Sequence, residues 1–299
     1  MSTPSNQKPE RSSTYFVQDR SNREELQRVH LQDQVLTRSM GGVLPEQSNP
    51  AAIQRVLDVG CGTGNWLIEL AKSFPTIQTL IGVDVSRVFV LYAREQAAAA
   101  HVSDRVEFHT MDGLRMLEFP TAYFDLVNHR LGISWLRTWD WPKLLQEYQR
   151  VTKPWGVVRV TEGSLQGCSS SAVQRINELV LQALYQAGHI FTPTSDGLMS
   201  QLASLLHKYG LREVQTRSYT LDYPITTPEG QAFAEDLKLG YRTIVPFLRK
   251  WMRVPDDYED LYQQMLSDMQ QPDFVATMGL LTAWGKSLFD AEVSPDFPR

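Results

Sequence analysis

A turn built on Gly60, Gly62 and Gly64 constrains the fold of this chain more than any other stretch. It follows a short apolar run at residues 55–59 and leads into residues 66–71, whose apolar spacing predicts a helix. We therefore expect a buried strand, a tight turn and the first crossover helix of an α/β sheet. Gly60 and Gly62 leave bare backbone where a ligand can lie, and Gly64 lets the helix pack close to the strand.

The spacing of these glycines separates the ligands that such turns bind. A dinucleotide fingerprint requires its third glycine at position 65, which is Asn65 here. A Walker loop ends in Gly-Lys-Ser/Thr, and the turn has no such ending. These two differences argue against a dinucleotide site and against a Walker-type phosphate site. A nicotinamide oxidoreductase on a similar sheet remains an alternative.

Acidic residues follow the next two predicted strands. The apolar run 79–84 ends in Asp84, which is suited to accept hydrogen bonds from a ribose diol. A third run, 106–110, leads directly to Asp112, and a fourth covers residues 124–128. Because ligands of open α/β sheets bind beyond the carboxyl ends of the strands, these positions form the predicted site.

The ordered set of these motifs resembles the class I S-adenosylmethionine-dependent methyltransferases, in particular the branch acting on small molecules and quinones. The matching segments are 57–64, 82–86, 111–113, 124–127 and 152–158. One departure is Trp155, where the family usually has glycine. The resemblance implies a doubly wound, seven-stranded, mostly parallel α/β sheet of the Rossmann-like kind. The capping and apolar patterns of the sequence add an N-terminal helix before the sheet and a helical insertion before the last strand.

The resemblance also implies S-adenosyl-L-methionine as the cofactor and assigns residues to it. Asp84 would accept from the ribose, Asp112 from the adenine amine with Met111 over the ring, and the Asn128 carbonyl from the ammonium group. Asp58 is read as an acceptor that orders the glycine turn. The complete predicted cofactor set is Gln32, Asp58, Gly60, Cys61, Gly62, Asp84, Val85, Met111, Asp112, Gly113 and Asn128.

A helix before the core supplies the candidate for the methionine carboxylate. Family members often use a polar side chain from such a helix, and Gln32 is the candidate here, with Arg28 and Arg38 as alternatives. Asp33 interrupts the apolar face of this helix. The simpler interpretation is an amphipathic helix packed on the core.

Catalysis needs little from the protein, because methyl transfer is an in-line displacement that depends on alignment and on water exclusion. His129 is the candidate general base for an acceptor that must lose a proton, and a structural histidine is the alternative. Trp135, Trp139 and Trp141 either pack the core or form a flat wall for an aromatic substrate. The sequence contains no convincing set of metal ligands, so no metal is expected.

We expect one domain enlarged by helical additions. Its predicted parts are a disordered N-terminus at 1–14, a helical cap at 15–50, the methyltransferase core at 51–225, a helical insertion at 226–272, and the last strand with a tail at 273–299. The insertion is a lid over the site or a dimer contact, and the sequence does not choose between them.

Composition limits the partners. The net charge of −5 argues against a broad grip on nucleic acid, and no apolar run is long enough to span a membrane. Two cysteines, Cys61 and Cys168, make no disulfide framework, which favours a cytoplasmic location. We therefore predict a methyltransferase for a small apolar or aromatic metabolite, with a homodimer as the candidate assembly. A non-catalytic interaction protein that binds the same cofactor is the remaining alternative.

Overall fold

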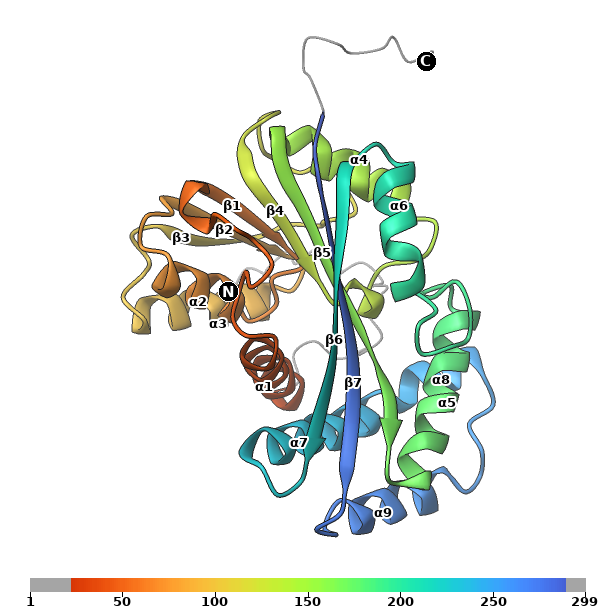
Figure 1. The fold of residues 1–299 in the computed structure, drawn as a ribbon. Helices are drawn as coiled ribbons and strands as arrows, with labels where there is room; N and C mark the ends of the chain where they lie inside the picture. Colours follow the sequence, from red (N-terminus) through yellow and green to blue (C-terminus); the bar gives the residue numbers. More distant parts are fainter. Residues whose placement is uncertain (1–22, 289–299) are drawn as a thin grey trace, which may run out of the picture.

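A computed structural model describes residues 23–288 of the chain (Figure 1). The predicted disordered segment 1–14 and the tail 289–299 lie outside these residues, as does Ser21, which the sequence pattern Ser21-Asn22-Arg23-Glu24 predicts as the cap of the first helix. The first helix, α1 (Arg23–Ser39), ends one residue before Met40 and the glycine pair at 41–42, as its sequence predicts.

A single mixed sheet organises the described residues, and its seven strands lie in the order β3-β2-β1-β4-β5-β7-β6. Strands β1 to β5 pair in parallel, and β7 runs antiparallel to both β5 and β6. The strands are β1 (Arg55–Val59), β2 (Thr79–Asp84), β3 (Val106–Thr110), β4 (Phe124–Arg130), β5 (Thr152–Cys168), β6 (Arg212–Pro224) and β7 (Val275–Lys286). The predicted doubly wound, mostly parallel α/β sheet is therefore confirmed.

Helices cover the two faces of this sheet in two groups (Figure 1). The helices α2 and α3 pack on one face with α1 beside them, and α4, α5 and α6 pack on the other. Their bounds are α2 (Asn65–Ser73), α3 (Arg87–Ala99), α4 (Trp141–Val151), α5 (Ser171–Gln186) and α6 (Leu202–Lys208), with single turns at Pro50–Ala52, Gly132–Ser134 and Met199–Gln201.

Alternating side chains of the central strands explain this layering. In β1, Val56 joins the hydrophobic cluster beneath α2 and α3, whereas Leu57 joins the cluster on the opposite face. In β4, Leu126 and Val127 divide in the same way. Because both faces are buried, these strands appear in the sequence as continuous apolar runs.

Serine hydroxyl groups cap the first turns of two helices. The Ser86 hydroxyl accepts from the backbone N–H of Phe89 at the start of α3, at 3.4 Å. Ser170 does the same for α5, accepting from Val173 at 3.2 Å. Each cap satisfies a backbone donor that the first turn of a helix leaves unpaired.

The predicted insertion lies between β6 and β7 and is helical. It contains α7 (Pro228–Thr243), α8 (Val245–Trp251) and α9 (Tyr258–Asp268), with Pro246 at the start of α8 and Pro255 between α8 and α9. Figure 1 shows these helices beside the long ends of β5, β6 and β7, where α7 packs against α1 and α9 packs against α5.

Candidate active site

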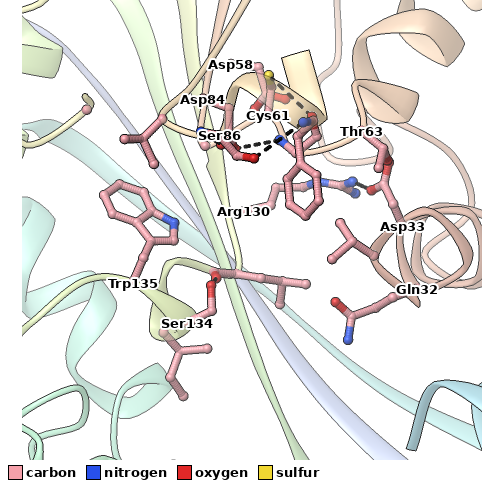
Figure 2. Close-up of a pocket in the computed structure, with 18 of the residues that line it drawn as sticks. Gln32, Asp33, Asp58, Cys61, Thr63, Asp84, Ser86, Arg130, Ser134 and Trp135 are labelled. Carbon is pink, nitrogen blue, oxygen red and sulfur yellow. Dashed lines mark hydrogen bonds and ion pairs between the residues drawn. The ribbon is translucent and has the colours of Figure 1, made fainter. Parts of the chain in front are cut away.

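A cavity of about 320 Å³ lies beyond the carboxyl ends of β1, β2 and β4, between these ends and α1 (Figure 2). In Figure 2, Trp135 stands on one side of it, and Gln32 and Asp33 of α1 stand on the other. Ten of the eleven predicted cofactor residues line this cavity: Gln32, Asp58, Gly60, Cys61, Gly62, Asp84, Val85, Met111, Asp112 and Gly113. The eleventh, Asn128, is not among the lining residues.

The glycine turn has the backbone conformation that its sequence predicts. Gly60, Gly62 and Gly64 have φ angles of 71°, 53° and 75°, in the left-handed region that side chains disfavour. A Cβ atom on Gly64 would approach the Phe108 ring to 2.5 Å, so glycine is required for α2 to pack at this distance. The turn therefore presents backbone to the cavity, where the Trp135 indole and the Val29 side chain would lie 3.1 and 3.3 Å from Cβ atoms on Gly60 and Gly62.

Asp84 holds the turn as well as lining the cavity. One carboxylate oxygen accepts from the backbone N–H of Gly62 at 3.0 Å, and the other accepts from Ser86 at 2.8 Å. These bonds link the end of β2 to the turn after β1 and fix the orientation of the carboxylate. Charge-assisted hydrogen bonds of this kind are the strong ones in proteins.

Asp112 is held by the loop after β3. Its carboxylate accepts from the backbone N–H of Leu114 at 3.0 Å and forms an ion pair with Arg115 at 3.3 Å. Met111 lies next to it in the cavity lining. The cavity thus has one fixed carboxylate at each of two neighbouring strand ends.

A buried polar row crosses the sheet below the cavity. Asp58, Asn128 and Arg159 are register partners on β1, β4 and β5. The Asn128 amide donates to Asp58 at 2.8 Å and accepts from Arg159 at 2.7 Å, and Arg159 pairs with Glu46 at 2.7 Å. Burial raises the pKa of Asp58 to about 7, and the hydrogen bond from Asn128 opposes that rise.

Asn128 is thus a correction to the sequence interpretation. It is fully buried between β1 and β5, two residues before β4 ends, and it joins the polar row. The residues of this segment that line the cavity are Arg130 and Leu131. A strand interior is covered by its neighbours on both sides, so the part of this segment that reaches the cavity is the strand end.

His129 is the second correction, because the general base that the sequence offered does not line the cavity. Its ring is fully buried, stacks on Trp141 at 5.8 Å between centroids and lies 3.5 Å from the Glu162 carboxyl group. Burial lowers the pKa of His129 to about 3. The ring is a neutral core group, and the structural alternative is the correct one.

The three polar residues of α1 that the sequence offered for the methionine carboxylate have different positions relative to the cavity. Gln32 lines the cavity and donates to Asp236 of α7 at 3.1 Å. Arg28 also lines it, but its guanidinium is held by Glu25 and Asp236, each at 2.9 Å. Arg38 is exposed and lies outside the lining.

The sequence reasoning gave no role to the pair formed by Arg130 and Asp33, both of which line the cavity. Arg130 also donates to the Thr37 hydroxyl at 3.0 Å, and its guanidinium lies 5.8 Å from the Trp66 ring. The signal for this pair was the acidic residue that interrupts the apolar face of α1. A buried carboxylate on such a face needs a cationic partner.

The three clustered tryptophans have three different environments. Trp135 lines the cavity, and a Cβ atom on Gly60 would lie 3.1 Å from its indole nitrogen. Trp141 is completely buried in the core, whereas Trp139 is 66% exposed. A flat wall made of all three rings is therefore wrong, and only Trp135 faces the cavity.

The insertion supports the cavity without lining it. All described cavity-lining residues lie outside 226–272, so the insertion side chains do not roof the cavity in this structure. The insertion contacts the cavity lining through Asp236, whose carboxylate accepts hydrogen bonds from Arg28 and Gln32 of α1. Its basic residues Arg242, Arg249 and Arg253 line a separate groove between α7, α8 and α9.

The cavity also has apolar lining residues. Leu131 and Ile133 after β4 and Met278 of β7 are among them, Gly163 adds bare backbone, and Val29 of α1 lies against the glycine turn, 3.3 Å from where a Cβ atom on Gly62 would be. Among residues 23–288 no cluster of His, Cys, Asp or Glu could hold a metal ion. In the same range, no helix combines the length and apolar character needed to cross a membrane.

Comparisons with known proteins agree with this geometry. Residues 56–156 match a family model described as a methyltransferase domain. A malonyl-[acyl-carrier protein] O-methyltransferase from Erwinia pyrifoliae is 33% identical over 147 residues, which cover 48% of this chain and 52% of that protein. A demethylmenaquinone methyltransferase from Porphyromonas gingivalis is 30% identical over 186 residues, which cover 58% of this chain and 74% of that protein.

The fold also matches a solved structure. The crystal structure of the YcgJ protein from Bacillus subtilis aligns with a TM-score of 0.53 and 19% identity, covering 83% of this chain and 98% of that one. The chain spans about half the length of the first curated relatives it matches. The oxidoreductase and non-catalytic alternatives gain no support from these relatives. The glycine turn, the strand order and the matched family model all agree, and the chain covers 74% of the relative from Porphyromonas gingivalis. The chain therefore belongs to the class I S-adenosylmethionine-dependent methyltransferases.

Proposed function

We propose that this protein transfers the methyl group of S-adenosylmethionine to an oxygen, carbon or nitrogen atom of a small apolar or aromatic metabolite. The observation that carries the proposal is one cavity that has both polar and apolar lining. The glycine turn with Asp84 and Asp112 supplies the polar lining, and Leu131, Ile133 and Met278 are among the apolar lining residues. Cofactor and acceptor would thus meet in a single cavity.

The polar lining fits an adenosyl ligand. In this proposal the backbone of Gly60 and Gly62 lies against the cofactor, Asp84 accepts from the ribose hydroxyls, and Asp112 accepts from the adenine amine. For the methionine carboxylate we favour Arg130 over Gln32, because a guanidinium attracts a carboxylate more strongly than an amide does.

The bound cofactor would supply an electrophilic methyl group. The chain would align the acceptor atom with that methyl group and exclude water. Met278, Leu131 and Ile133 exclude water around the acceptor, which strengthens every electrostatic contact there. Histidine is absent from the described lining, so proton removal would depend on Asp33 or on an acceptor that is already nucleophilic. In-line displacement requires only that the nucleophile be held against the methyl carbon.

Two further features support the small-molecule setting. The net charge of −5 disfavours a nucleic-acid acceptor, and the relative from Porphyromonas gingivalis is named for a quinone. We place the reaction in the cytoplasm, since Cys61 and Cys168 are both free thiols. The insertion remains our proposed contact for a homodimer, and sedimentation equilibrium would test that assignment.

Two measurements test the proposal. Calorimetry with S-adenosylhomocysteine and with NADH should give binding of the first only, and binding of NADH alone would refute the cofactor assignment. A methyl-transfer screen with labelled cofactor should label small apolar or aromatic acceptors. RNA and protein serve as the control acceptors, and labelling confined to either would refute the small-molecule acceptor.

A further inference from the structure

The turn that follows β4 has an unfavourable backbone and carries several of the residues that line the cavity. Leu131 has a φ of 54°, in the left-handed region that side chains rarely adopt. A Cβ atom on Gly132 would overlap the ring of His129. Such a conformation persists only where surrounding contacts enforce it.

The side chain of Glu162 supplies such a contact. One of its carboxyl oxygens accepts from the backbone N–H of Gly132 at 2.8 Å, and the other accepts from Ile133 at 3.1 Å. Glu162 lies on β5, immediately before the cavity-lining Gly163, and its side chain is fully buried. Two hydrogen bonds from one rigid strand therefore fix two successive peptide units of the turn.

The fixed turn determines which side chains reach the cavity. Leu131, Ile133, Ser134 and Trp135 all line it. Further bonds within the turn, from Trp135 and Leu136 to the Gly132 carbonyl at 2.9 and 2.7 Å, extend the same conformation to the indole. A change in the peptide units at 132 and 133 would therefore move most of this wall.

The surroundings of Glu162 keep it neutral. The His129 ring lies 3.5 Å from the Glu162 carboxyl group and is itself uncharged, so it supplies no charge that would favour the carboxylate. Burial raises the pKa of Glu162 to about 8, so the carboxyl group is mainly protonated at neutral pH. A neutral carboxyl group still accepts hydrogen bonds at both oxygens and costs far less to bury than a carboxylate.

We propose that Glu162 is the positioning residue for the methyl acceptor: by binding the two backbone N–H groups of Gly132 and Ile133, it holds the turn that forms the acceptor wall. The identity of the acceptor rests on the proposed function, whereas the conformation of the turn does not. Glu162 touches neither ligand in this scheme and acts through Ile133 and Ser134.

The test compares Glu162→Gln with Asp125→Asn in the full-length chain. Asp125 is the control, because it also accepts from two backbone N–H groups but at the opposite end of the sheet. One of its oxygens accepts from Gln54 and Arg55, at 3.0 and 2.8 Å, and the other pairs with Lys153. Glutamine keeps one acceptor and turns an N–H₂ group toward the other donor. Hydrogen exchange, followed by mass spectrometry, is measured for the peptide that covers residues 130–136, and calorimetry gives the affinity for S-adenosylhomocysteine.

In Glu162→Gln we expect the backbone amide hydrogens of that peptide to exchange about ten-fold faster, because a ten-fold change corresponds to the loss of roughly one hydrogen bond. We expect the affinity for S-adenosylhomocysteine to stay within about two-fold, and the KM for an acceptor found in the screen to rise about ten-fold with a smaller change in kcat. Asp125→Asn should leave the peptide and the KM unchanged. Unchanged exchange in Glu162→Gln, or equal acceleration in both variants, would overturn the proposal.

The two proposals fail in different ways. If the wild type methylates no small molecule, the proposed function is refuted, while the exchange comparison still decides whether Glu162 holds the turn. If exchange accelerates but the acceptor KM and kcat are unchanged, Glu162 is only structural and the positioning role is wrong.

Discussion

Asp84 gives the sharpest test of the cofactor site, because its carboxylate has two separable tasks. It accepts from the backbone N–H groups of Gly62 and Ser86 at 3.0 and 2.8 Å, and it lines the cavity where the ribose is proposed to bind. In Asp84→Asn, the amide oxygen can still accept from one donor. The N–H₂ group then faces the remaining donors, and the negative charge is lost.

The size of the effect follows from these contacts. A hydrogen bond to a charged group contributes about 1.5 to 3 kcal/mol, so the loss of one such bond to the ribose should weaken binding about 10- to 150-fold. The measurement is the Kd for S-adenosylhomocysteine by calorimetry. Thermal unfolding in the absence of ligand reports the separate loss at the glycine turn, which we expect to be about 1 to 3 kcal/mol.

Asp125→Asn is the control for the binding measurement, since Asp125 also accepts from two backbone N–H groups, pairs with Lys153 at 2.6 Å and lies outside the cavity lining. It should lower the free energy of unfolding, mainly through the lost ion pair, and leave the Kd unchanged. If Asp84→Asn loses stability like the control but binds S-adenosylhomocysteine with the wild-type Kd, Asp84 only holds the turn and the ribose assignment is wrong.

Three other predictions follow from single positions. Trp135 lines the cavity and Trp139 does not, so Trp135→Phe should remove most of the change in tryptophan fluorescence on binding S-adenosylhomocysteine, whereas Trp139→Phe should keep it. The reverse result would show that Trp139, not Trp135, is the ring close to the ligand. Gly132→Ala should lower the free energy of unfolding in urea by about 3 kcal/mol or more, because the new Cβ atom has no space. Gly167→Ala, whose Cβ atom would have its nearest contact at 3.9 Å, should lower it by less than about 1 kcal/mol. Equal losses in the two variants would contradict the packing. Glu162 has its pKa raised to about 8, so the folded protein keeps a proton that the unfolded chain releases between its ordinary value of 4.5 and 8. The free energy of unfolding contributed by this group therefore falls as pH rises through that window, by up to about 1.4 kcal/mol per pH unit, and wild-type and Glu162→Gln unfolding curves that stay parallel across it would refute this.

Much of the fold and the polar lining of the site followed from short-range sequence patterns. The glycine turn, the strand before it and the helix caps at Ser86 and Ser170 are encoded within a few residues each. Asp84 and Asp112 were found because carboxyl ends of parallel strands meet at one edge of a sheet. Such features depend on backbone conformation and on side-chain period, which the local sequence determines.

The rest of the site depended on contacts between distant segments. Arg28 and Asp236 are 208 residues apart, and Glu162 lies 30 residues from Gly132, so no local pattern pairs them. Asn128 and His129 appeared accessible because the sequence does not specify where β4 emerges from between β1 and β5. The sequence by itself determined which strands and turns form, whereas the tertiary structure decided which side chains face the cavity, because exposure at a strand end depends on how far the neighbouring strands and helices extend past it.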